Sequence, residues 1–388
     1  MTWHLLILVK NRRRPFAKDA HAPCMGLAKK ASAKASISHV GGQHQSANVS
    51  QKEKMGLFAP KKELCPDFCK TLPSDLSGKV FAITGTTSGT GYVAAQTIAE
   101  LGGTVLLLNR PSERAQQALK TLQEAVGGGA FVAIDCDLQD FASVREAAGQ
   151  IKAKYERLYC LCCNAGIVGK DEVTKDGYDV TIQTDHYSHF LLTALLLDLL
   201  EAEAQLNGDA RIVNHSSGLR LNTPDHKLDP KYFEKKEAPD TLGGSDMTFG
   251  KGCWLRHHQG KLANTVFTYG LHTKLQSKGS KIRVIAAQPG FCDTNGVASC
   301  ATEMTFVARM FYNLYVKFNA QNAQDGTMGL LRGMADAEAK SGVMYSPKGD
   351  GMSGPAVEAE LESFEKDPDV IQMLWEVSEA ATGVKLAA

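Results

Sequence analysis

The feature that most constrains the fold is an alternation of short apolar runs with longer helical patterns between residues 76 and 287. Apolar runs of this length, bounded by turn residues, predict buried strands. We expect strands at 79–84, 104–108, 130–134, 158–163, 210–214 and 282–287, and helices at 92–101, 112–126, 141–155, 185–200 and 260–278. Because the strands are apolar throughout, the pattern predicts an α/β fold with one parallel sheet covered by helices on both faces.

Charge divides the chain into two parts. The 388 residues carry a formal net charge of +1, yet residues 1–54 hold ten Lys and Arg against two acids. This basic, acid-poor segment is typical of an organelle transit peptide, with the chloroplast favoured over the mitochondrion, although a disordered tail without an address remains an alternative. We therefore expect a disordered leader at 1–54, a linker at 55–75 and a single domain at 76–388. The domain is mildly acidic, which argues against nucleic-acid binding.

The ten cysteines do not suggest a disulfide framework. Cys160, Cys162 and Cys163 share one apolar run, and Cys65 and Cys69 lack a second pair of ligands at zinc-site spacing. We expect reduced thiols and no metal.

A glycine-rich turn follows the first expected strand and opens the first expected helix at residues 84–91. Glycine at such a junction lets backbone N–H groups approach a pyrophosphate, and the helix N-terminus favours an anion there. The second strand ends at Asn109 and Arg110, where NAD-binding sites usually place an acid. Arg110 could pair with a 2′-phosphate, which favours NADP(H) as the cofactor.

Ordered motifs from residue 76 to 378 resemble the short-chain dehydrogenase/reductase family. Residues 212–217 resemble its serine strand, and 261–264 resemble its catalytic lysine and the residues that follow it. Residues 189–193 and 374–378 are similar to the branch of retinol dehydrogenases and protochlorophyllide reductases. The resemblance implies a Rossmann-type, doubly wound sheet. It also implies cofactor contacts from Gly85, Thr87, Ser88, Gly89, Thr90, Gly91, Asp137, Leu138, Asn164, Ala165, Gly166, Lys261, Pro289, Gly290 and Thr294.

Two of the four catalytic positions that the resemblance implies hold other residues here. Ser217 and Lys261 stand where the family has them, but His257 replaces the proton-donating tyrosine and Asp185 replaces the asparagine that anchors the lysine. A histidine, whose ordinary pKa is about 6.5, can donate a proton at neutral pH. We expect Asp185 behind Lys261 and not behind His257, which disfavours a hydrolase-like trio of Ser217, His257 and Asp185.

Two hypotheses for the function follow. The first is an NADPH-dependent oxidoreductase that acts on an apolar carbonyl or alkene, with His257 as the proton donor. The second is a catalytically impaired NADP(H)-binding protein that acts as a sensor or as a structural subunit of an assembly. Dinucleotide binding is common to both.

Two further segments bear on substrate and partners. The long polar stretch 218–254 is predicted to be a substrate loop. Within the expected C-terminal helical segment 303–388, residues 305–318 are rich in aromatic side chains and form either an ordinary packed helix or a peripheral membrane contact. We also expect a small apolar substrate. The chain is further expected to form a homodimer or to be a subunit of an assembly.

Overall fold

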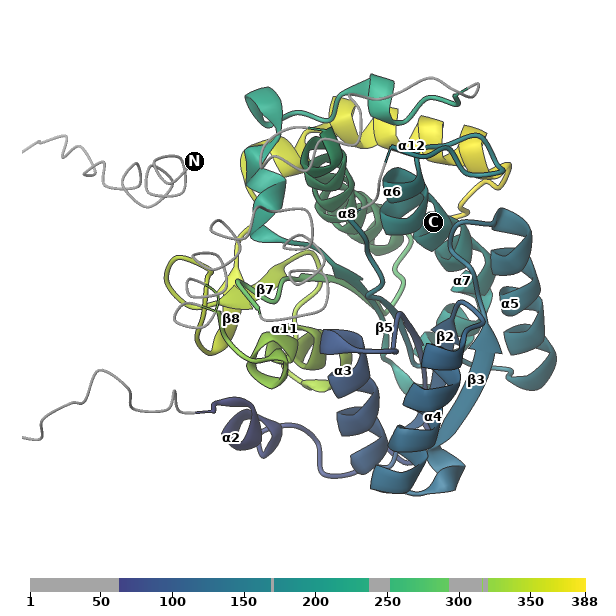
Figure 1. The fold of residues 1–388 in the computed structure, drawn as a ribbon, viewed down its shortest axis with the longest axis vertical. Coiled ribbons are helices and arrows are strands. Elements are labelled where there is room, and N and C mark those ends of the chain that lie inside the picture. The colour runs from purple at the N-terminus through teal and green to yellow at the C-terminus, as the bar shows by residue number, and fades with distance from the viewer. Residues whose placement is uncertain (1–62, 169–170, 237–251, 293–315, 317–319) are drawn as a thin grey trace, which may run out of the picture. The chain divides into compact units, whose positions relative to one another are not determined.

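The computed structural model describes residues 63–168, 171–236, 252–292, 316 and 320–388. The expected leader, residues 237–251, Thr294 and all of 305–318 except Val316 lie outside the described residues. Within the described part, eight strands form one sheet (Figure 1). They are β1 (Val80–Thr84), β2 (Thr104–Asn109), β3 (Phe131–Asp135), β4 (Cys160–Cys163), β5 (Ala210–His215), β6 (Ile282–Ala287), β7 (Met344–Pro347) and β8 (Ala356–Ala359).

The strands lie in the order β3-β2-β1-β4-β5-β6-β7-β8. All neighbouring pairs are parallel except β7 with β8, which is antiparallel. The chain winds outward from β1 to β3 and then returns to place β4 on the other side of β1. This reversal confirms the predicted doubly wound sheet, and it creates the crevice at the carboxyl ends of β1 and β4 where such sheets bind ligands.

Helices cover both faces of the sheet, as predicted (Figure 1). One buried cluster joins the sheet to α5, α7, α8 and α12, and a second joins it to α2, α3, α4 and α11. The helices are α2 (Cys65–Cys69), α3 (Gly89–Glu100), α4 (Glu113–Val126), α5 (Phe141–Lys154), α6 (Val180–Ile182), α7 (Ser188–Asn207), α8 (Gly252–Ser277), α11 (Ala323–Ala335) and α12 (Pro368–Thr382).

The structure differs from the predicted boundaries mainly at helix starts and in the C-terminal part. The segment 303–388 was expected to be helical, but it contains the strands β7 and β8, which extend the sheet. Helix α8 begins at Gly252, inside the segment expected to be a loop to residue 254, and α7 is preceded by a π-helical turn at Gln183–Tyr187. The described part of the expected linker, residues 63–75, contains α2 and packs on the domain through buried Cys65 and Leu72.

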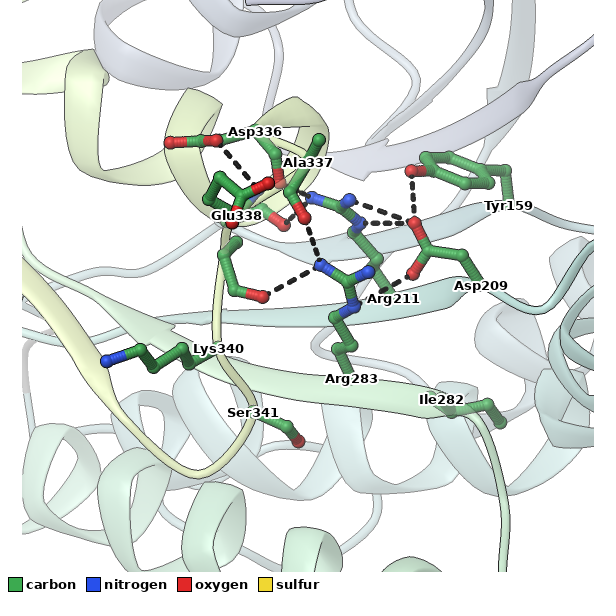
Figure 2. Close-up of polar contacts among 12 residues, drawn as sticks. Tyr159, Asp209, Arg211, Ile282, Arg283, Asp336, Ala337, Glu338, Lys340 and Ser341 are labelled. Carbon is green, nitrogen blue, oxygen red and sulfur yellow. Dashed lines mark hydrogen bonds and ion pairs between the residues drawn. The ribbon is translucent and has the colours of Figure 1, made fainter.

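A charged network connects the amino ends of β5 and β6 to the end of α11 (Figure 2). It lies at the opposite end of the strands from the glycine-rich turn. The Asp209 carboxylate lies 2.9 Å from Arg211 Nη2 and 3.2 Å from Arg283 Nε. The two guanidinium groups also donate to the carbonyl oxygens of Asp336 and Ala337, just beyond the end of α11. Cations at a helix C-terminus satisfy carbonyls that lack partners within the helix.

Candidate active site

The turn between β1 and α3 has a backbone that requires glycine. Gly85 and Gly89 have φ angles of +72° and +61°. A Cβ atom on Gly85 would lie 2.9 Å from the Cα of Ala165, and one on Gly91 would lie 2.4 Å from the carbonyl oxygen of Gly85. The turn therefore leaves the start of α3 free of side chains that would bar a pyrophosphate.

Two asparagines hold this turn to its neighbouring strands. Asn164, which follows β4, donates to the carbonyl oxygen of Thr84 at 2.8 Å and accepts from the Thr90 hydroxyl at 3.0 Å. Asn109, at the end of β2, accepts from the Thr86 N–H at 2.8 Å. These bonds order the turn in advance of any ligand, which is what a tight binding site requires.

Arginines gather beside the turn at the carboxyl end of β2. Arg110 is exposed there. Arg114, in the first turn of α4, donates to the Ser88 hydroxyl. Two guanidinium groups near one turn favour a doubly charged anion such as a phosphate. Arg114 was not among the predicted site residues, although it lies four residues after Arg110, in the first turn of the next helix.

Asp185 is fully buried in the π-helical turn before α7. One carboxylate oxygen accepts from the Ile167 N–H at 2.8 Å. The other lies 3.2 Å from Lys261 Nζ and 3.3 Å from His257 Nδ1. Burial alone would raise the pKa of Asp185, but the charge of Lys261 and the contact with His257 outweigh it, so the pKa is lowered. Asp185 is therefore a buried carboxylate shared by two basic side chains.

The surroundings of His257 fix which ring nitrogen carries the proton. Nδ1 lies 2.9 Å from the carbonyl oxygen of Ile167, and its other near neighbour is the Asp185 carboxylate. Both neighbours are acceptors, so Nδ1 is protonated and Nε2 is the atom left to exchange a proton. The ring also packs edge-on against Trp254, with ring centroids 6.3 Å apart.

Lys261 lies at the meeting point of β5 and α8. Besides Asp185, its ammonium group contacts the carbonyl oxygen of His215 at 3.3 Å, and Asn264 donates to the same oxygen at 3.0 Å. A Cβ atom on Gly166 would lie 2.6 Å from Lys261 Nζ. Gly166, which belongs to a predicted motif, has no side chain and therefore leaves space for the ammonium group of Lys261.

Ser217 follows β5, where its hydroxyl accepts from the Leu219 N–H at 3.2 Å and caps the short helix Gly218–Asn222. Its neighbour Ser216 is buried and donates to the carbonyl oxygen of Lys261 at 2.7 Å. The predicted serine therefore follows the strand whose end contacts Lys261, although no hydrogen bond joins Ser217 to His257 within the described part of the chain.

Known proteins share this arrangement of motifs. The model of the short chain dehydrogenase family matches residues 79–226. Retinol dehydrogenase 14 of Mus musculus is 30% identical over 328 residues, which cover 80% of this chain and 88% of that protein. The chain belongs to the short-chain dehydrogenase/reductase family. Within the family it resembles the retinol dehydrogenase branch.

Two further relatives extend the comparison. An uncharacterised oxidoreductase of Schizosaccharomyces pombe is 36% identical over 246 residues, covering 63% of this chain and 67% of that protein. A crystal structure of an uncharacterised protein from Mycobacterium paratuberculosis superposes with a TM-score of 0.62 at 26% identity, covering 82% of this chain and 98% of that one. Short-chain dehydrogenases are oxidoreductases that use NAD(P), and the fold and glycine-rich turn seen here agree with that class.

One expectation about the family's catalytic positions was wrong. We expected Asp185 to lie behind Lys261 and not behind His257, but the carboxylate contacts both. The reason is local, because a Cβ atom on Gly260 would lie only 3.2 Å from the Cβ of Asp185. Glycine at that position lets the π-helical turn approach α8 closely enough for the carboxylate to reach two successive turns of the helix.

A buried arginine next to His257 was also missed. Arg256 is fully buried, and its Nε lies 2.9 Å from the Asp179 carboxylate. Burial raises the pKa of Asp179 to about 6. Asp179 caps α6, so this ion pair fixes the chain that precedes the π-helical turn of Asp185. The sequence gives one weak signal for this ion pair, because Arg256 is a charged residue directly before His257 in α8.

The other predicted cofactor residues lie at the same edge of the sheet. Pro289 and Gly290 follow β6, and a Cβ atom on Gly290 would lie 2.4 Å from the carbonyl oxygen of Met352. Asp137 and Leu138 follow β3, where Asp137 accepts from the Gln139 N–H at 3.0 Å and so shapes a local turn. Their ligand roles remain predictions.

The described residues contain no group of three or more histidine, cysteine or acidic side chains placed to hold a metal ion. None of the described helices is long and apolar enough to cross a membrane.

Proposed function

We propose that this chain is an NADP(H)-dependent oxidoreductase for an apolar carbonyl or alkene substrate, in which His257 exchanges the proton. The observation that carries the proposal is the position of Asp185, 3.3 Å from His257 Nδ1 and 3.2 Å from Lys261 Nζ. His257 Nδ1–H donates to the Ile167 carbonyl oxygen beside this carboxylate, which leaves Nε2 to act as the acid or base.

The cofactor end of the site fits a dinucleotide on two counts. The glycine-rich turn, which Gly85 and Gly91 keep packed closely against Ala165 and Asn164, opens α3, whose N-terminus favours a pyrophosphate. In addition, His215 Nδ1 lies 2.9 Å from the Asn164 side-chain oxygen, while its buried Nε2 has no hydrogen-bond partner among the described residues. A buried acceptor without a donor costs about 1–3 kcal/mol, which a hydroxyl or amide of a bound cofactor would relieve.

The position of His215 indicates which half of the cofactor it would meet. A dinucleotide that spans the sheet with its adenosine end at Arg110 and Arg114 brings its nicotinamide end to β4 and β5. His215 ends β5. Burial, with a smaller effect of the positive charge of Lys261, lowers the pKa of His215 to about 3, so the ring is neutral and its free nitrogen is an acceptor.

The preference for NADP(H) over NAD(H) is supported at the other end. Arg114 donates to Ser88 in the turn and Arg110 is exposed at the end of β2, so a 2′-phosphate there would give both guanidinium groups an anionic partner.

The chain's own groups have separate tasks in the proposed reaction. The bound dinucleotide would supply or accept the hydride. Lys261, oriented by Asp185 and by the carbonyl oxygen of His215, would hold the cofactor ribose. In reduction, protonated His257 would donate the Nε2 proton to the developing oxyanion and remain as the neutral Nδ1–H form, held by Ile167 and Asp185. In oxidation, the same Nε2 would accept the alcohol proton.

The second hypothesis, an NADP(H)-binding protein without turnover, rests on one observation. Lys261 is already engaged by a buried carboxylate, where the family has a neutral asparagine. An imidazole is also shorter than a phenol, and a displacement of a proton donor by about 1 Å can cost ~10²-fold in rate. In that case the protein would serve as a sensor or as a subunit of an assembly.

We further propose a chloroplast location directed by residues 1–54. We also propose a homodimer or larger assembly, and a peripheral membrane contact through residues 305–318. Their support is the basic, acid-poor composition of the leader and the aromatic content of the latter segment.

A binding assay followed by a turnover assay tests the proposed function. NADPH affinity is measured by calorimetry, and NADPH oxidation is then followed with a panel of aldehydes and ketones for the wild type and for His257→Tyr. We expect the wild type to bind NADPH and to turn over, and His257→Tyr to lose activity, because its hydroxyl cannot replace Nδ1–H beside Asp185. Binding without turnover in the wild type, with activity gained in His257→Tyr, would establish the second hypothesis instead. Failure of the wild type to bind NADPH would refute both.

A further inference from the structure

Two cysteines of α2 lie on the same side of the helix, far from the catalytic groups in the fold. The sulfur atoms of Cys65 and Cys69 are 3.6 Å apart. Cys65 is 4% exposed, whereas Cys69 is partly accessible to solvent. The other six described cysteines are buried, so within the described residues Cys69 is the thiol that a reagent in solution can reach.

The contact makes the two thiols chemically unequal. A hydrogen bond from the Cys65 thiol favours the charged form of Cys69 and lowers its pKa. The same contact, together with burial, raises the pKa of Cys65. The thiolate is the nucleophile in thiol chemistry, so the accessible member of the pair is also the more reactive one.

We propose that Cys65 and Cys69 form a reversible dithiol–disulfide site that an external disulfide oxidises, and that oxidation opens α2. In the first step, the Cys69 thiolate attacks a sulfur of the external disulfide, forms a mixed disulfide and releases one external thiol. In the second step, Cys65 loses its proton, attacks Cys69 Sγ and releases the second external thiol. The pair gives up two electrons and two protons, and the external disulfide is reduced to two thiols.

Opening follows from the dimensions of a helix. Residues four apart in an α-helix have Cβ atoms about 5–6 Å from each other. A disulfide needs a Cβ separation of about 3.5–4.5 Å. The bond therefore cannot form while α2 keeps its helical backbone, even though the two sulfur atoms are in contact.

The opening of α2 would reach the body through Asp325, among other contacts. The backbone N–H groups of Leu64 and Cys65 both donate to the Asp325 carboxylate at 2.8 Å. Asp325 lies in the first turn of α11, whose Thr327 contacts the carbonyl oxygen of Thr90 beside the glycine-rich turn. Oxidation of the pair would therefore loosen the attachment of the N-terminal segment to the helix that supports the cofactor turn.

The site is tested on the full chain with glutathione disulfide as the oxidant. Remaining thiols are alkylated, and the peptide containing residues 65–69 is examined by mass spectrometry. We expect this peptide to lose the mass of two hydrogen atoms and to regain it after dithiothreitol. Amide hydrogen exchange of the segment at Leu64 and Cys65 is expected to become about ten-fold faster in the oxidised protein, because the bonds to Asp325 are released.

Two variants serve as controls. Cys69→Ser is expected to form no disulfide and to show no faster exchange. Cys136→Ser is expected to behave like the wild type, because burial raises the pKa of that thiol to about 12 and leaves it inert. Alkylation of both Cys65 and Cys69 after oxidation would overturn the proposal. So would pairing of either with another cysteine, such as Cys24 or Cys300, or a Cys65–Cys69 bond without faster exchange at residues 64–65.

Discussion

His257 Nδ1 lies 3.3 Å from the Asp185 carboxylate, although the two residues are far apart in the chain. The contact joins the helix that carries Lys261 to the π-helical turn that precedes α7. It gives the histidine a fixed tautomer and a charge partner, which a tyrosine at the same position would not need.

Replacing Asp185 with asparagine, the residue that the family has there, tests the role of the charge. We expect kcat to fall at least about 10-fold, because the imidazolium form of His257 loses its carboxylate. The measurement is kcat and KM from pH 5 to 9. As a matched control, Asp198→Asn removes a carboxylate that is 60% exposed on α7, and its profile should match the wild type.

The same carboxylate predicts a pH dependence of stability. Because the folded pKa of Asp185 is lowered, its contribution is present above the unfolded value of about 3.9 and is lost as the pH falls through the folded pKa. The difference in unfolding free energy between wild type and Asp185→Asn should therefore shrink below about pH 4. Urea titrations at pH 7 and pH 3.5 would measure this, and a constant difference would mean that the carboxylate titrates normally.

Buried histidines give a second, separate pH window. Burial lowers the pKa of His186 to about 3, and its ring bonds to Ser378. The unfolded chain, with a histidine pKa of about 6.5, binds this proton first, so stability is lost as the pH falls from about 6.5 toward 3. His186→Gln should reduce the slope of unfolding free energy against pH by up to about 1.4 kcal/mol per unit. Denaturant unfolding at pH 7.5, 6.0 and 5.0 tests this, and an unchanged slope would contradict it.

We predict that Gly260 matters more for the geometry of the active site than for the stability of α8. Alanine in a helix interior gains about 1 kcal/mol over glycine, but a Cβ on Gly260 would lie 3.2 Å from the Cβ of Asp185. Gly260→Ala should therefore show little net change in stability and roughly a 10-fold loss of kcat. Gly149→Ala in α5, where a Cβ meets nothing within 4 Å, should gain about 1 kcal/mol and keep full activity. Equal gains in both variants would show that Asp185 is not crowded.

In the charged network at the amino ends of β5 and β6, Asp209 and Arg283 should contribute unequally to the free energy of unfolding. Asp209→Ala leaves Arg211, whose side chain is 1% exposed, without its carboxylate, at a cost of about 3 kcal/mol. Arg283→Ala removes a side chain that is 30% exposed and should cost about 1 kcal/mol or less. Urea unfolding would measure the loss of unfolding free energy in each variant. Similar losses would contradict the claim that the deeper burial of Arg211 makes the Asp209 variant less stable (Figure 2).

The core of the fold was predictable because local pattern determines it. The strands β1 to β6 fall within about two residues of their predicted positions, since each is a short apolar run between turn residues. The later elements β7, β8 and α11 were missed, because Met344–Pro347 and Ala356–Ala359 are short and lie among glycines that obscure any period. Helix α2 was missed because only five residues form it.

The site divides in the same way. Gly85, Asn164 and Lys261 belong to motifs that spacing identifies, and the structure brings them to one edge of the sheet. The contact of Asp185 with His257 could not be predicted, because it depends on a π-helical turn and on the close approach that Gly260 allows. Such features arise from packing between distant segments, which leaves no periodic trace in the sequence.

The central claim is that His257 exchanges the proton. The most direct test compares kcat for NADPH-dependent carbonyl reduction at pH 7 between the wild type and His257→Phe, with NADPH affinity measured for both. The account predicts unchanged affinity and a fall in kcat of about 10²-fold or more, because phenylalanine keeps the ring but has no proton to give. Equal kcat values in the two proteins would contradict it.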